Sequence, residues 1–98
     1  MTRTPKDIAN QRYDRRYSYL DDTGELRRIS ESAVKRLAVV AANAPVGHTD
    51  GYSWNSAQVR NAEEAGLWTV EWTGPRAWKI TELTALGTRV LSDITGQP

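Results

Sequence analysis

Cysteine is absent from this 98-residue chain, and histidine occurs once, at His48. A chain without cysteine has neither disulfides nor thiolate metal sites. One histidine is too few for a histidine-based zinc site, and no glycine-rich loop of the kind that cradles nucleotide phosphates is present. The sequence therefore predicts a protein that carries no metal and no cofactor.

Long apolar segments are also missing. The longest run of apolar residues covers positions 37–42, whereas a membrane-spanning helix needs roughly 20 such residues. The N-terminal residues lack the continuous apolar segment of a secretory signal. We therefore expect a cytoplasmic protein with no membrane partner.

Neither sign of charge is in large excess, because 13 Lys and Arg residues stand against 12 Asp and Glu residues. The small positive excess lies in residues 1–30, which hold seven basic and five acidic side chains. Nucleic-acid-binding proteins often have a larger excess, so a DNA-binding surface here would depend on a local patch. We expect a basic arm or short helix over residues 1–16. Residues 17–98 should form a single domain with one core.

Strand and turn signals open this domain. Tyr17 and Tyr19 alternate with polar residues, and a turn-forming cluster begins at Asp21, so residues 17–29 predict a β-hairpin. Asp22-Thr23-Gly24 is similar to the signature triplet of retroviral aspartic proteases, but charged residues stand where that family has apolar ones. A turn explains the triplet fully, and we expect no enzymatic activity.

The strongest helical pattern follows this hairpin. Ser30 is suited to cap the helix, and Pro45 ends the pattern. Apolar residues recur at spacings of three and four, which predicts a core helix with one buried face. The expected buried stripe consists of Val34, Leu37, Ala38, Ala41 and Ala42.

Four further segments complete the chain. Proline and glycine residues indicate a loop over residues 44–52. We expect a helix over residues 53–65 ended by Gly66, a β-hairpin over residues 67–80 turning at Gly74-Pro75, and a last helix capped by Thr84. The inward-facing residues of the last two elements should be Trp68, Val70, Trp72, Trp78, Ile80, Leu86, Val90, Leu91 and Ile94.

This order of elements resembles a winged helix-turn-helix domain. Two short motifs add to the resemblance: Glu63-Glu64-Ala65-Gly66-Leu67 before the first wing strand, and Leu83-Thr84-Ala85-Leu86-Gly87 at the last helix. The resemblance covers residues 30–94. The chain departs from the family pattern at residues 45–52, where the family has a short second helix. The resemblance implies an α+β winged helix with a core helix, a recognition helix, a β-hairpin wing and a C-terminal helix. This chain adds an N-terminal β-hairpin.

The resemblance also implies a small transcriptional regulator that acts as a homodimer. It would read duplex DNA with helix 53–65 and with the wing at residues 67–80. Asn and Gln can bond adenine in the major groove, Arg can bond guanine, and basic groups on a wing can reach phosphates. The positions expected to contact DNA are Ser53, Ser56, Gln58, Arg60, Asn61, Arg76 and Lys79.

A second interpretation is a protein–protein interaction module that does not bind DNA. Glu63, Glu64 and Glu71 lie close to the basic candidates in the sequence and would repel phosphate. Trp54 and the wing would then contact a protein partner, because tryptophan is enriched at binding hot spots. Trp54 is equally suited to fixing helix 53–65 onto the preceding helix.

Overall fold

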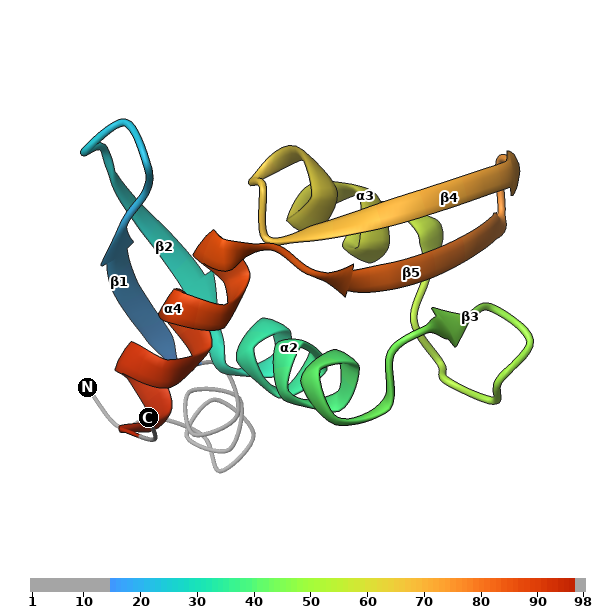
Figure 1. Ribbon diagram of the computed structural model, residues 1–98, viewed down its shortest axis with the longest axis horizontal. Helices are drawn as coiled ribbons and strands as arrows, with labels where there is room; N and C mark the ends of the chain where they lie inside the picture. Colours follow the sequence, from blue (N-terminus) through green and yellow to red (C-terminus); the bar gives the residue numbers. More distant parts are fainter. Residues whose placement is uncertain (1–14, 97–98) are drawn as a thin grey trace, which may run out of the picture.

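The computed structural model describes residues 15–96 of the chain. The arm predicted for residues 1–16 therefore lies, except for its last two residues, outside the described part. The described residues form an N-terminal β-hairpin, three helices and a three-stranded antiparallel sheet (Figure 1). The predicted α+β fold with an extra N-terminal hairpin is confirmed, and the order of elements is compatible with a winged helix.

The N-terminal hairpin consists of β1 (Arg16–Leu20) and β2 (Leu26–Ser30). The strands pair antiparallel over five rungs, from Arg16 opposite Ser30 to Leu20 opposite Leu26. Tyr19 and Ile29 point into the core and are buried. The tyrosine alternation therefore reports the inner face of this hairpin correctly.

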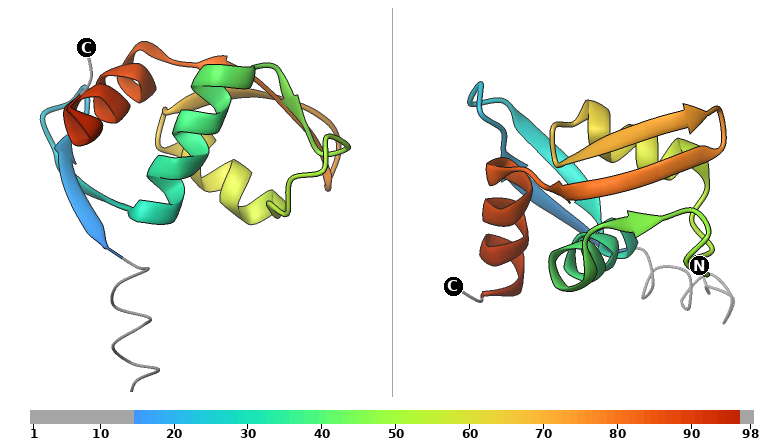
Figure 2. Two further views of the ribbon diagram at one scale, coloured as in Figure 1. Left: turned by 90° about the horizontal axis from the view of Figure 1, so that it is seen from below. Right: turned by 45° about the vertical axis from the view of Figure 1, so that its right-hand side comes forward.

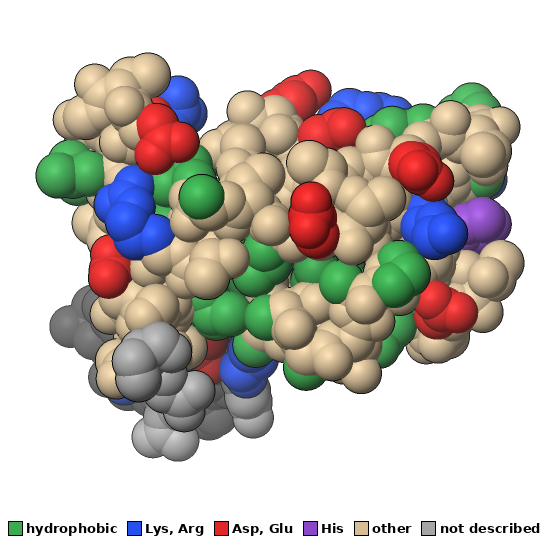
Figure 3. All heavy atoms as spheres, in the orientation of Figure 1, with side chains coloured by type: hydrophobic (Ala, Val, Ile, Leu, Met, Phe, Trp, Pro, Cys, Tyr) green, Lys and Arg blue, Asp and Glu red, His purple; other side chains and the backbone are tan. Residues whose placement is uncertain are grey.

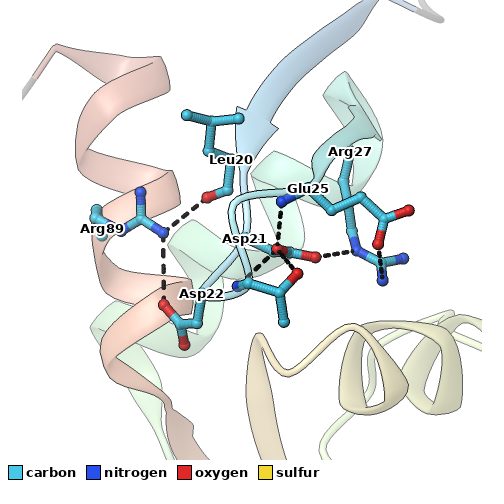
Figure 4. Close-up of polar contacts among 7 residues, drawn as sticks. Leu20, Asp21, Asp22, Glu25, Arg27 and Arg89 are labelled. Carbon is cyan, nitrogen blue, oxygen red and sulfur yellow. Dashed lines mark hydrogen bonds and ion pairs between the residues drawn. The ribbon is translucent and has the colours of Figure 1, made fainter.

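The hairpin turn is organised around the carboxylate of Asp21 (Figure 4). It accepts hydrogen bonds from the hydroxyl and the backbone N–H of Thr23, from the backbone N–H of Glu25 at 2.9 Å, and from Arg27 Nε at 2.6 Å. The Thr23 hydroxyl and the Arg27 guanidinium hold the pKa of Asp21 well below its usual range. The Asp-Thr-Gly triplet is thus part of a turn, as its flanking residues predict.

Arg89 ties this hairpin to the C-terminal helix. Its Nη2 donates a hydrogen bond of 2.8 Å to the carbonyl oxygen of Leu20 and lies 3.6 Å from the carboxylate of Asp22 (Figure 4). Figure 2 shows the same arrangement from two further sides, with the C-terminal helix next to the N-terminal hairpin. The extra hairpin is therefore attached to the end of the domain opposite the wing tip (Figure 1).

Helix α2 (Glu31–Asn43) begins as predicted, because the Ser30 side chain accepts a hydrogen bond from the N–H of Ala33. Its buried face, however, differs from the predicted stripe. Val34, Leu37 and Val40 are the buried residues. Ala38, Ala41 and Ala42 are exposed, so these three predictions were wrong. Burying Val40 removes more apolar surface from water than burying an alanine, and this rotates the helix toward the valine.

A two-residue strand, β3 (Val46–Gly47), follows α2 where the winged-helix family has its second helix. It pairs with the last strand of the sheet, which has the order β3-β5-β4. The turn after it is closed by the carboxylate of Asp50, which accepts a hydrogen bond of 2.7 Å from the N–H of Gly47. Residues 44–55 therefore contain a strand and a turn and no helical segment.

Helix α3 (Ser56–Glu64) is shorter than the predicted helix over residues 53–65. Its first residue is set by Asn55, whose side chain accepts a hydrogen bond of 2.8 Å from the N–H of Gln58. The Gln58 side chain in turn accepts one of 3.0 Å from the N–H of Asn55, which completes a capping box. The helix therefore begins at Ser56, three residues after the predicted start at Ser53.

The wing consists of β4 (Trp68–Gly74) and β5 (Ala77–Leu83), and it turns at Gly74-Pro75 as predicted. Trp68 is buried and donates its indole N–H to the carbonyl of Val59 in α3, at 3.0 Å. Trp78 and Ile80 on β5 are also buried, while Lys79 between them is exposed. The predicted alternation of the wing is therefore confirmed, with one face against the helices.

Helix α4 (Ala85–Thr95) is anchored where two short sequence motifs, residues 63–67 and 83–87, meet. The backbone N–H of Thr84 donates a 3.0 Å hydrogen bond to the carbonyl of Leu67, and its hydroxyl donates to the carbonyl of Gly66. Gly87 lies so close that a Cβ built there would be 2.0 Å from the Leu67 carbonyl oxygen. The glycine of Leu-Thr-x-x-Gly is therefore required by a close backbone approach.

Every helix and strand within residues 15–96 contributes a residue to one core. No helix within residues 15–96 is long and apolar enough to cross a membrane. The buried apolar residues are Tyr19, Ile29, Val34, Leu37, Val40, Val46, Val59, Leu67, Trp68, Trp78, Ile80, Leu86 and Val90.

Replacing Gly87 by alanine is expected to lower the free energy of unfolding by about 1–3 kcal/mol, because the new methyl group overlaps the Leu67 carbonyl. Alanine has a higher helix propensity than glycine, so a loss of stability can only come from this contact. Denaturant unfolding measures the change. Gly74→Ala is the matched control, since its Cβ would meet only Ala77 at 3.6 Å. Equal stability of Gly87→Ala and wild type would contradict the close approach.

Asp21→Asn is expected to destabilise the protein at neutral pH and to have less effect in acid. The pKa of Asp21 is depressed in the folded state, so its ionised form contributes stability above the ordinary carboxyl pKa of about 4. This contribution to stability declines as the pH falls from the ordinary carboxyl pKa toward the lower pKa of the folded state. Unfolding curves at several pH values should show the two proteins converging below about pH 4. Asp93→Asn, at an exposed carboxylate of α4, is the control, and a pH-independent difference for Asp21→Asn would contradict the mechanism.

Candidate functional site

The outer face of α3 presents the side chains predicted to read DNA. Val59 faces the core, and this orientation leaves Ala57, Arg60, Asn61 and Glu64 exposed to solvent. The capping box fixes the start of the helix, and the bond from Trp68 to the Val59 carbonyl fixes its distance from the wing. The exposed face is thus held on a rigid element.

A three-residue contact joins α3 to the wing. The guanidinium of Arg60 lies over the ring of Trp72, with its central carbon 4.7 Å from the ring centroid. The indole N–H of Trp72 donates a 3.0 Å hydrogen bond to the carboxylate of Glu63. The positive group is therefore positioned by the wing, and one of the acidic groups that would repel phosphate is engaged in a bond.

The other predicted positions on this segment lie either on α3 or just before it. Ser56 and Asn61 lie on α3, where Ser56 is half-buried and Asn61 exposed. Ser53 precedes the helix and lies in an extended segment. Gln58 lies on α3, but its amide oxygen belongs to the capping box, which leaves its amide N–H groups as donors.

The basic residues of the wing lie in two different places. Arg76 is exposed in the turn at the tip of the hairpin. Lys79 stands directly opposite Glu71 in the register of the sheet. Lys79 and Glu71 alternate along their strands with residues that face α3, so these two side chains lie on the sheet face turned away from the helix. Figure 3 shows this face, where acidic and basic side chains are intermixed over the wing. Lys79 is therefore not on the same surface as Arg60.

The structure adds two arginines that the sequence did not single out. Arg28 of β2 and Arg36 of α2 line a hollow of about 250 Å³, together with Gln58 and Asn61 of α3. Burial lowers the pKa of Arg36. The small basic excess of residues 1–30 was the only sequence signal for Arg28. Nothing local marks Arg36, because tertiary packing alone brings α2 and α3 together.

Trp54 is a member of an internal aromatic stack. Its ring centroid lies 4.8 Å from that of Tyr52, 6.2 Å from that of Trp68 and 5.9 Å from that of Trp78, with small interplanar angles. The side chain is half-buried. Trp54 therefore packs the segment before α3 onto the wing, and it also lines a pocket together with Lys35 and Val39 of the preceding helix α2.

The described residues hold no cluster with the geometry of a metal site. Within residues 15–96, no three His, Asp or Glu side chains gather closely enough to bind a metal ion. The Nδ1 atom of His48 lies 3.2 Å from the carbonyl oxygen of Trp78, and its ring meets the edge of that indole. His48 is therefore a loop residue that helps to hold β3 against the wing.

Comparison of the chain with protein-family models, with curated proteins and with solved structures gives no match.

Proposed function

We propose that the protein binds duplex DNA as a small transcriptional regulator, with α3 in the major groove and the β4–β5 hairpin as the wing. The observation that carries the proposal is the contact of Arg60, Trp72 and Glu63. It couples helix and wing into one unit and leaves the guanidinium exposed between them. The order of elements, compatible with a winged helix, supports the same geometry.

The chemistry of the exposed face suits base edges better than a row of phosphates. With nine residues, α3 is about 13.5 Å long, and a helix with its side chains is about 10–12 Å in diameter, which fits a groove about 12 Å wide. Asn61 can bond adenine and Arg60 can bond guanine, while Glu64 can accept a bond from cytosine. Arg76 at the wing tip is the group that would reach a phosphate or the minor groove.

Arg60→Ala and Arg76→Ala are each expected to weaken binding to mixed-sequence duplex DNA by about tenfold, because each removes a positive group from the proposed surface. Titration of labelled duplex between roughly 50 and 200 mM salt measures the affinity and its salt dependence. Lys79→Ala is the matched control, because Lys79 lies on the other face of the wing. Its affinity should stay within about twofold of wild type. Absence of binding at the lowest salt would refute the proposal.

We further propose that the protein acts as a homodimer on DNA. A single α3 contacts only a few base pairs, and helix-turn-helix proteins commonly pair two such helices about one helical turn apart. Light scattering of the protein, alone and with duplex, should give twice the chain mass of 11.0 kDa. A mass of one chain under both conditions would contradict this.

The alternative function is recognition of a protein partner. The observation that favours it lies on the N-terminal hairpin, where Leu20 and Leu26 face each other in register and are 53% and 66% exposed. Such a pair is compatible with a small apolar contact, although single exposed leucines are common. A failure of DNA binding would favour this alternative, with the N-terminal hairpin in place of Trp54 as the contact surface.

A further inference from the structure

We infer that the hollow lined by Arg28, Arg36, Gln58 and Asn61 is a phosphate-binding subsite that holds one backbone phosphate of the DNA beside α3. The inference rests on the proposed function for its ligand. It concerns a surface that the resemblance to winged helices did not indicate, because Arg28 belongs to the extra N-terminal hairpin.

Most residues that line the hollow are apolar, and its polar part, apart from Ser30, is cationic and amidic. Its lining residues include two arginines from separate elements, β2 and α2, and two amide residues of α3. No Asp or Glu is among its lining residues. Its apolar part is formed by residues of the core, such as Leu37 and Trp68. A cavity of this composition attracts a small anion with several acceptor oxygens.

The two arginines of the hollow differ from two other arginines in the described part of the chain. Arg27 and Arg89 are paired with carboxylates. Among residues 15–96, the side chains of Arg28 and Arg36 make no ion pair or hydrogen bond with any other residue. Arg36 is moreover half-buried, so it has lost part of its hydration without gaining a counter-ion. A bound anion would supply the missing partner.

The amide groups favour a phosphate oxygen as the ligand. The N–H of Asn55 occupies the amide oxygen of Gln58, which orients the amide nitrogen as a donor. Guanidinium and amide donors together match the acceptor oxygens of a phosphodiester. A helix in the major groove has a phosphate backbone on each side. Arg76 would contact the backbone on the wing side, and this subsite would contact the other one.

The test combines DNA titration with a phosphate titration. Arg28→Gln with Arg36→Gln should lower the slope of log affinity against log salt by about 1, the value for one lost phosphate contact. Arg28→Gln with Arg36→Lys should recover part of the slope that the double glutamine variant loses, because lysine keeps the positive charge at position 36. Lys35→Gln is the matched control, since Lys35 pairs with Glu31 and lies outside the hollow. Circular dichroism of every variant verifies the fold.

The second arm uses inorganic phosphate, with sodium chloride at equal ionic strength as its control. In ¹H–¹⁵N NMR spectra of the wild-type protein, phosphate should shift the side-chain amide signals of Gln58 and Asn61 and the Nε–H signal of Arg36. These signals report the hollow directly, without DNA.

The outcomes separate the two proposals. DNA binding with an unchanged salt slope in the double variant, and no shift with phosphate, would overturn the subsite and leave the proposed function standing. Phosphate shifts without any DNA binding would overturn the proposed function and identify the hollow as a site for free phosphate groups. Absence of both would overturn both.

Discussion

The close approach of α4 to the carbonyl of Leu67 is the constraint on which the rest of the fold depends. It brings the end of α3, the base of the wing and the start of α4 to one point, where Thr84 bonds to the carbonyls of Gly66 and Leu67. Only glycine at position 87 allows the helix to come this near. The two short motifs that carried the family resemblance are therefore the two halves of one backbone contact.

A second set of contacts, made by two tryptophans of the wing, holds the candidate surface in place. Trp68 bonds to the backbone of α3, and Trp72 bonds to Glu63 while supporting Arg60. Tryptophan suits this position because it buries a large ring and still offers one N–H donor. The wing thus fixes both the position of the helix and the direction of an exposed charge. The surface is built on rigid elements.

Local signals in the sequence were sufficient for most of the fold, because caps, turns and alternation act between near neighbours. Ser30, Gly66 and Thr84 each mark a helix end by a bond or a backbone angle within a few residues. The buried face of α2 could not be predicted in this way. Whether its valines or its alanines are buried depends on packing partners that only the tertiary structure supplies. The hollow beside α3 was hidden for the same reason, since Arg28 and Arg36 meet α3 from distant parts of the chain.

The bonds of Thr84 to Gly66 and Leu67 also define how the molecule can open. They close the whole wing into a loop whose two ends are held together, with a separation of 18 residues between Gly66 and Thr84. The wing can separate from the rest of the domain only when α4 loses its close contact with the backbone of Leu67. We therefore expect the wing and the C-terminal helix to unfold as one cooperative unit, in which backbone amides of both elements exchange with solvent in the same opening event.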